Sequence, residues 1–219
     1  RIAIMQPYFL PFLGYFQLIN SVDKFIIYDD DYFKKGGWIN RNRLRNNIDF
    51  RIPIKKPSQN KLIMDTEIKW NDKLIEKFFK TIKHLYASSP NYQKIDLVLN
   101  NLFGKKPRTI SELAIASIIE ISRYLELDTE FKIASEENYD KGKDKIENLI
   151  KICKAEGALI YINAIGGKNL YSKSDFKQNG INLLFLQTGI SHSILDYCFT
   201  MDKEIIRHKL NNYRLIEAD

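Results

Sequence analysis

Residues 2–31 read IAIMQPYFLPFLGYFQLINSVDKFIIYDDD, and this stretch decides the fold of the chain. Ile2 to Met5 and Phe25 to Tyr28 are short apolar runs typical of buried strands, while Phe12 to Ile19 suits a helix. A strand, a helix and a second strand in this order predict the opening of a βαβ unit, whose two strands run parallel. The stretch therefore indicates an α/β fold.

Polar side chains follow both predicted strands. Gln6 comes directly after the first strand and Asp29 after the second. Ligands of open α/β sheets bind beyond the carboxyl ends of the strands. We therefore expect a binding site at this edge of the sheet.

The middle of the chain is predicted to be helical. Asn71 or Asp72 can cap a helix that continues to Tyr86, a second helix spans 95–103, and the capping box Thr109 to Glu112 starts a third. A looser apolar alternation favours a strand over 62–70.

Helix and strand patterns alternate again after residue 144, with strands expected at 158–162 and 181–186. The predicted fold class is thus α/β and Rossmann-like, a mostly parallel sheet flanked by helices, with a helical middle segment. We expect residues 1–219 to form one domain, with 71–128 as a helical subdomain or cover.

Composition excludes several classes of protein. Two cysteines, Cys153 and Cys198, are too few for a disulfide framework and suit buried thiols in a reducing cytoplasm. No apolar run approaches the roughly 20 residues that span a bilayer, so no membrane insertion is expected. The three histidines are far apart and form no metal-ligand motif, so no metal is predicted. The net charge of +7 favours an anionic partner, but the repeated aromatic spacing of a nucleic-acid groove is missing.

The run from Gln6 to Tyr15 is the first candidate for chemistry. Pro7 and Pro11 stiffen a turn, and Gly14 allows close backbone approach where a helix N-terminus would favour an anion. The arrangement resembles the opening of nucleotidylyltransferases, but Tyr15 stands where their histidine would stabilise the transferring phosphate. A proline and glycine turn packed by aromatic side chains explains the run equally well.

Asp29, Asp30 and Asp31 form an acidic cluster at the second strand end. Because adjacent carboxylates repel, at least one should have a raised pKa or recruit a cation. One of them could take a proton from an amine or hydroxyl nucleophile, hold Mg²⁺, or pair with Arg41 or Arg43. Solvated or ion-paired carboxylates account for two of the three.

The segment Trp38-Ile-Asn-Arg-Asn-Arg43 is the densest candidate for ligand recognition. In extended backbone, Trp38, Asn40 and Asn42 would share one face and Arg41 and Arg43 the other. Arginine forks bind phosphate and pyrophosphate, amides bind sugar hydroxyls, and the indole could stack on a ring.

Two later motifs carry weaker signals. Gly166 and Gly167 follow a predicted strand and could cradle an anion through backbone N–H groups, although a plain turn fits as well. His192, Ser193 and Asp196 contain the residue types of a catalytic triad, but triads assemble in space and most such triplets are coincidental.

Taken together, these motifs resemble the WbqC-like family over essentially the whole chain. The matching residues are Ile4-Met-Gln-Pro-Tyr8, Pro11, Gly14-Tyr-Phe16, Asp23-Lys-Phe25, Tyr28-Asp-Asp30, Trp38-Ile-Asn-Arg-Asn-Arg43, Ser89-Pro90, Tyr161-Ile-Asn-Ala-Ile-Gly-Gly167, Leu170-Tyr171 and Ser193-Ile-Leu-Asp196. Members occur mainly among genes for bacterial surface polysaccharides, notably O-antigen clusters with amino sugars. The resemblance implies a cytoplasmic N-acyltransferase, with acetyl as the expected group, that acts on a nucleotide-linked amino sugar.

On that hypothesis, acetyl-CoA or another acyl-CoA is the donor, and the chain forms a homo-oligomer or is fused to another glycan-biosynthesis domain. Chemical reasoning then assigns the base to Asp29 or Asp30 and orientation of the acceptor to Gln6 and Tyr15, with Tyr15 in the catalytic group. The expected substrate-binding residues are Gln6, Tyr8, Gly14, Trp38, Asn40, Arg41, Asn42, Arg43, Gly166 and Gly167.

One stretch departs from the family pattern. Members usually carry a longer polar and aromatic segment before Ser193, where this chain has only Gln187-Thr-Gly-Ile190. Two other classes of function stay open from the sequence. They are a nucleotidyl- or adenylate-handling transferase and a non-catalytic nucleotide-sugar binding module.

Overall fold

The computed structural model describes residues 1–189 and 192–217, and the fold is α/β and Rossmann-like. The strands are β1 (Ile2–Met5), β2 (Lys24–Ile27), β3 (Arg41–Leu44), β4 (Ile48–Arg51), β5 (Glu130–Ile133), β6 (Ile160–Ala164), β7 (Asn182–Gln187) and β8 (Arg214–Glu217). The helices are α1 (Leu13–Asn20), α2 (Asp72–Tyr86), α3 (Tyr92–Gly104), α4 (Ile110–Tyr124), α5 (Lys145–Ala155), α6 (Lys173–Lys177), α7 (Ile194–Thr200) and α8 (Lys203–Leu210).

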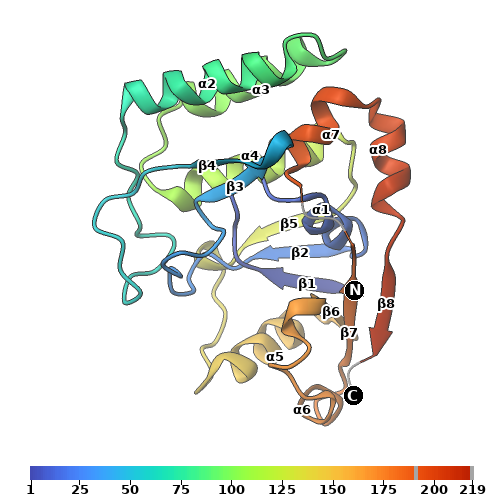
Figure 1. The fold of residues 1–219 in the computed structure, drawn as a ribbon. Helices are drawn as coiled ribbons and strands as arrows, with labels where there is room; N and C mark the ends of the chain where they lie inside the picture. The colour runs from blue at the N-terminus through green and yellow to red at the C-terminus, as the bar shows by residue number, and fades with distance from the viewer. Residues whose placement is uncertain (190–191, 218–219) are drawn as a thin grey trace.

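A six-stranded sheet with the order β5-β2-β1-β6-β7-β8 forms the centre of the molecule (Figure 1). From β1 the chain builds β2 and β5 on one side, and it then returns to add β6 and β7 on the other. Neighbouring strands pair in parallel except β7 and β8, which are antiparallel. The strand order therefore reverses between β1 and β6, which is the point where open α/β sheets bind ligands.

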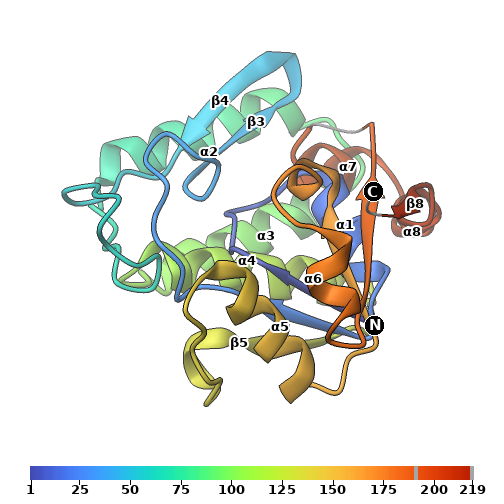
Figure 2. The same ribbon diagram turned by 90° about the horizontal axis from the view of Figure 1, so that it is seen from below.

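Helices cover both faces of the sheet, as the two views of the ribbon show (Figures 1 and 2). Ala3 and Phe25 pack in one apolar cluster with residues of α1, α4, α7 and α8. Ile2 and Ile4 point to the opposite face and pack with residues of α5 and α6. This alternation follows from the two-residue period of a strand and explains why β1 is apolar at every position.

The helical middle segment is confirmed. The Asn71 side chain caps α2 by accepting a hydrogen bond from the Leu74 N–H, and Thr109 caps α4 by accepting from the Glu112 N–H. Helix α2 lies over a two-stranded hairpin of β3 and β4, and Phe78 of α2 packs on Phe50 of β4 (Figure 1). None of the helices that the structure describes combines the length and the apolar character needed to cross a membrane.

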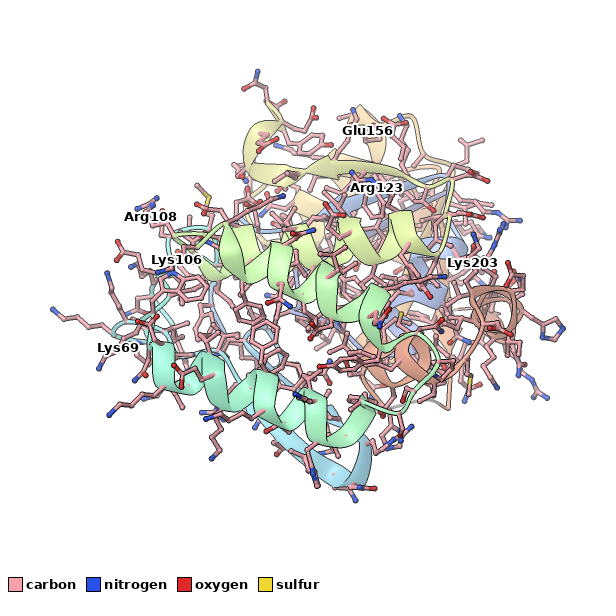
Figure 3. The ribbon with its side chains drawn as sticks, turned by 90° about the horizontal axis from the view of Figure 1, so that it is seen from above. Lys69, Lys106, Arg108, Arg123, Glu156 and Lys203 are labelled. Atoms are coloured by element: carbon pink, nitrogen blue, oxygen red, sulfur yellow. The ribbon has the colours of Figure 1, made fainter. Side chains whose placement is uncertain are left out.

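The expected strand over 62–70 is wrong. This segment makes only isolated bridges, such as Glu67 with Thr109, and its backbone is tied to the start of α4. The Ile68 N–H donates to the Arg108 carbonyl over 2.9 Å, which draws together the segments that carry Lys69, Lys106 and Arg108 (Figure 3). Hydrogen bonds to a distant loop thus replace the ladder that the apolar alternation indicates.

Candidate functional site

A cavity of about 380 Å³ opens at the carboxyl ends of β1 and β6, where the strand order reverses. We call it the strand-end cavity. Its polar and aromatic lining consists of Gln6, Tyr8, Tyr28, Asp31, Lys34, Lys145, Tyr161, Asn163 and Tyr171. A cavity therefore lies at the edge of the sheet where the sequence predicts a site.

Asp31 is the carboxylate that lines this cavity. Its Oδ2 accepts hydrogen bonds from Gln6 Nε2 at 2.8 Å and from Lys145 Nζ at 2.7 Å, and its Oδ1 accepts from the Tyr32 N–H at 2.8 Å. The Asp31 side chain is 16% exposed. A mostly buried carboxylate with a cation and an amide as partners is held in one orientation at the cavity wall.

The neighbouring carboxylates of the acidic cluster do not line the strand-end cavity. Asp29 is buried and accepts hydrogen bonds from Ser111 Oγ, Ser135 Oγ and the Ser135 N–H, so it ties β2 to α4 and to the segment after β5. Asp30 pairs with Lys141. The prediction that at least one of the crowded carboxylates finds a cation is confirmed, but the partners are Lys141 and Lys145 and not the expected Arg41 or Arg43.

Four tyrosines line the strand-end cavity: Tyr8, Tyr28, Tyr161 and Tyr171. Burial raises the pKa of all four phenols. They are therefore neutral hydroxyl groups that can donate and accept hydrogen bonds. Such an aromatic wall with a few polar groups is typical of sites for small organic ligands.

Tyr15 lies behind this wall. Its hydroxyl donates to the backbone carbonyl of Gln6 over 2.8 Å, and its side chain is buried. Tyr15 thus fixes the backbone that carries Gln6. It lines neither the strand-end cavity nor the second cavity, which is described next.

A second cavity, of about 390 Å³, adjoins the hairpin of β3 and β4. We call it the arginine–tryptophan cavity. Its lining consists of Tyr8, Pro11, Phe12, Trp38, Arg41, Asn42, Arg43, Asn47 and His192. Tyr8 lines both cavities, so the two lie on either side of this one side chain.

Trp38 and Arg41 form a stacked pair at the second cavity. Arg41 Cζ lies 4.6 Å from the centroid of the indole ring, which is a cation–π geometry. The guanidinium also donates to the Gly37 carbonyl at 2.9 Å and to the Gly36 carbonyl at 2.7 Å. Trp38 is 47% exposed, so its ring is available to a ligand.

The asparagines of this segment have mainly structural contacts. Asn40 Nδ2 donates to the Ile52 carbonyl over 2.8 Å, and Asn42 Nδ2 donates to the Leu10 carbonyl. Both residues are buried, as the alternation predicts, whereas Arg43 is exposed and pairs with Asp49 at 2.7 Å. The expectation that Trp38 shares the asparagine face is wrong, because Trp38 precedes the strand and turns toward Arg41. Of Asn40 and Asn42, only Asn42 lines the second cavity.

Hydrogen bonds from distant segments fix the run from Gln6 to Tyr15. Leu10 has a φ of 47°, its N–H donates to Ser117 Oγ at 3.1 Å, and its carbonyl accepts from Ser193 Oγ at 3.0 Å. The Leu13 N–H donates to the His192 carbonyl at 3.3 Å, and the first turn of α1 is buried. The anion expected at this helix N-terminus is therefore not supported.

Gly14 has a packing role. A Cβ atom at this position would lie 2.5 Å from Thr188 Cγ2 and 2.6 Å from the Phe12 ring. Any larger residue would clash. Gly14 lets α1 approach the end of β7, and it does not line either of the two cavities.

Gly166 and Gly167 do line the strand-end cavity, in the short 3-10 turn that follows β6. A Cβ atom on Gly167 would lie 3.0 Å from both Asn163 Nδ2 and the Tyr171 ring. Gly167 therefore lets these two side chains come together at the cavity.

The triad residues do not assemble. Ser193 Oγ donates to the Leu10 carbonyl, while Asp196 accepts from the Tyr86 hydroxyl and pairs with Arg45. In the short stretch before Ser193, Ile190 lies outside the described residues. Within the ranges 1–189 and 192–217, no group of three or more His, Cys, Asp or Glu side chains could hold a metal ion.

Sequence reasoning missed Lys145, Tyr161, Asn163 and Tyr171 as cavity residues. A usable signal was the position of Asn163 beside the end of the predicted strand 158–162. Parallel strands share one carboxyl edge, so residues that follow different strands meet there. Lys145 comes from the first turn of α5, which starts at the same edge.

Comparison with known proteins gives two matches. A family model described as the WbqC-like protein family matches residues 6–204. The chain is also 26% identical over 188 residues to "Uncharacterized protein Rv1507c" of Mycobacterium tuberculosis, covering 84% of this chain and 80% of that protein. No solved structure gives a significant match.

Proposed function

This chain belongs to the WbqC-like protein family, and we propose that it is an N-acyltransferase, with acetyl as the expected group, acting on a nucleotide-linked amino sugar. The role we propose is surface-glycan biosynthesis in the cytoplasm. The observation that carries the proposal is the position of Tyr8, which lines both a cavity containing a carboxylate and a cavity containing arginines and an exposed indole. Two adjacent cavities of different chemistry suit one ligand with two different halves.

The nucleotide half fits the arginine–tryptophan cavity. Arg41 and Arg43 supply guanidinium groups for the pyrophosphate, and Trp38 supplies a ring on which a base can stack. Arg43 already pairs with Asp49, so Arg41 is the stronger candidate for the phosphate contact.

The amino sugar fits the strand-end cavity. Neutral tyrosine hydroxyls and the Gln6 and Asn163 amides can bind sugar hydroxyls, and Asp31 can bind the amine. Lys34 and Lys145 also line this cavity and add positive charge to it, with Lys145 paired to Asp31. Asp31 takes the place of Asp29 and Asp30 as the proposed base, because it lines the cavity.

The proposed reaction transfers an acyl group from acetyl-CoA or another acyl-CoA. The amine nitrogen forms a bond to the thioester carbonyl carbon, and the carbon–sulfur bond then breaks. Asp31 accepts the proton that the nitrogen loses, and this proton passes to the leaving thiolate or to solvent. The Tyr8 hydroxyl, which is neutral and lies near Asp31, is a candidate donor to the developing oxyanion.

The test is to incubate the protein with acetyl-CoA and a panel of nucleotide-linked 3- and 4-amino sugars and to follow release of free thiol. Release with at least one sugar is expected, and release with none would contradict the proposal. Pyrophosphate release that depends on ATP and Mg²⁺ would instead support a nucleotidyl- or adenylate-handling transferase. Tight binding without turnover would support a nucleotide-sugar binding module.

A further inference from the structure

The outer edge of β4 is open to pairing. On its inner side, β4 pairs with β3, and just beyond the strand the Ile52 N–H donates to the Asn40 carbonyl over 2.8 Å. Because the backbone groups of successive residues point to alternate sides of a strand, those of Asp49 and Arg51 point away from β3. Figure 2 shows the hairpin at the margin of the molecule, and β3 is the strand that pairs with β4 in the described chain.

An apolar cavity of about 420 Å³ runs along the same edge, between β4 and α2. Its lining includes Phe50 of β4 and Leu74, Ile75 and Phe78 of α2. Leu74 is 43% exposed. An unpaired strand edge beside exposed apolar side chains is a template for pairing with another chain.

The charges of the hairpin indicate which chain this is. Arg51 is directly opposite Arg41 on β3, and like charges in this position destabilise a strand pair. Asp49, the carboxylate of β4, pairs with Arg43 at 2.7 Å. Within residues 1–189 and 192–217, Arg51 forms no ion pair with a carboxylate. A second strand that places a carboxylate opposite Arg51 would supply the missing counter-charge.

We propose that two copies of this chain form a two-fold symmetric dimer, in which the outer edges of their β4 strands pair antiparallel about Phe50. In this register, Asp49 of each copy is opposite Arg51 of the other. The backbone groups of Asp49 and Arg51 are then those that hydrogen-bond between the copies, which agrees with the side of β4 to which they point. A two-fold interface requires a self-complementary surface, and the sequence around Phe50 is self-complementary in charge.

Charged side chains on an edge strand can also prevent pairing. Charges of a single sign serve that role, because like charges then meet whenever two copies pair. In β4 the two charges have opposite signs and flank Phe50 symmetrically, so pairing of two copies brings opposite charges together. The arrangement therefore favours association with a second copy.

The inference does not rest on the proposed function. Arg51 lines neither the strand-end cavity nor the arginine–tryptophan cavity. Loss of the dimer through Arg51 should therefore leave the affinity for a sugar nucleotide unchanged.

The test measures mass by sedimentation velocity over protein concentrations of about 1–100 µM. The proteins are the wild type, Asp49→Arg, Arg51→Asp and an equimolar mixture of these two variants. Lys177→Glu, on the distant helix α6, is the matched control for a reversal of charge. Circular dichroism checks that each variant is folded, and Arg51→Asp should fold because it places a carboxylate opposite Arg41.

The wild type and Lys177→Glu should form dimers with twice the mass of one chain. Each β4 variant alone should dimerise at least about tenfold more weakly, because like charges then meet twice in the interface. The equimolar mixture should dimerise like the wild type, since the two positive positions of one variant then face the two negative positions of the other. A structural effect of either substitution within its own chain would not be rescued by mixing.

Three results would overturn the inference. The first is a wild type that stays monomeric across the concentration range. The second is a dimer that Asp49→Arg and Arg51→Asp leave as tight as before, since its interface then lies elsewhere. The third is a mixture of the two variants that dimerises no better than either variant alone.

Discussion

Gln6 Nε2 donates a hydrogen bond to Asp31 Oδ2 over 2.8 Å, and this contact joins the end of β1 to the loop after β2. Lys145, from the start of α5, binds the same oxygen at 2.7 Å. Three segments that are far apart in the chain thus converge on one carboxylate at the reversal of strand order. This convergence is the physical basis for placing the reacting group of a ligand in the strand-end cavity.

Asp31→Asn should lower turnover by about 10²-fold or more, since an amide cannot accept the proton that the amine loses. Binding of the sugar nucleotide should change by less than about threefold, because Asn is close in size and still accepts a hydrogen bond through its oxygen. Steady-state thiol release and calorimetry separate the two effects. Asp30→Asn is the matched control and should retain turnover, since Asp30 pairs with Lys141 outside the cavity lining. Equal losses in the two variants would remove Asp31 as the base.

Arg41→Ala should weaken binding of a sugar nucleotide by about tenfold, because it removes a guanidinium from the cavity proposed for the pyrophosphate. The melting temperature should change little, since the lost hydrogen bonds reach only the carbonyls of Gly36 and Gly37. Arg51 is opposite Arg41 in the hairpin and does not line this cavity. Arg51→Ala is therefore the control for a general loss of charge. A fall in stability that matches the fall in affinity would reject Arg41 as a ligand contact.

Gly14→Ala should destabilise the fold by about 1–3 kcal/mol, since the added methyl group overlaps the side chains of Thr188 and Phe12. Gly104→Ala is the contrasting control, because nothing lies within 4 Å of a Cβ built there. Urea unfolding of both variants measures the difference. A Gly14→Ala protein as stable as the wild type would show that close packing does not require this glycine.

Glu156 should make stability depend on pH in acid. Burial tends to raise its pKa, but hydrogen bonds from Lys132, Lys24 and Tyr139 outweigh burial and lower it to about 2 (Figure 3 shows Glu156). An unfolded glutamate has a pKa of about 4.3. The stabilisation is therefore present above pH 4.3 and is lost as the pH falls toward 2.

Glu156→Gln should accordingly cost about 1–3 kcal/mol at pH 7. The difference from the wild type should shrink as the pH is lowered from about 4.3 toward 2. Chemical denaturation across this range gives the comparison. A difference that is constant with pH would show that the Glu156 carboxylate does not titrate below its ordinary range.

The first thirty residues predict the centre of the fold because their order follows local rules. The observed β1 has the predicted bounds, and α1 begins at Leu13, within one residue of the predicted helix over 12–19. The strands β5 and β8 were not predicted, since each is interrupted by charged residues and lacks the continuous apolar run of β1. They form because an existing sheet edge is available to pair with them.

The site was only partly predictable for a related reason. Which of three adjacent aspartates faces a cavity depends on partners distant in sequence. Asp29 is withdrawn into the core by Ser111 and Ser135, which leaves Asp31 at the cavity wall. The amides of Asn40 and Asn42 resemble ligand contacts in the sequence, but their acceptors are the carbonyls of Ile52 and Leu10. No local pattern specifies such tertiary acceptors.

A crystal structure with a nucleotide-linked amino sugar tests most directly whether one such ligand occupies both cavities that share Tyr8. We predict electron density for the nucleotide beside Trp38 and Arg41, and the amine nitrogen within about 3 Å of an Asp31 oxygen. A nucleotide bound elsewhere, or an amine directed away from Asp31, would contradict the account.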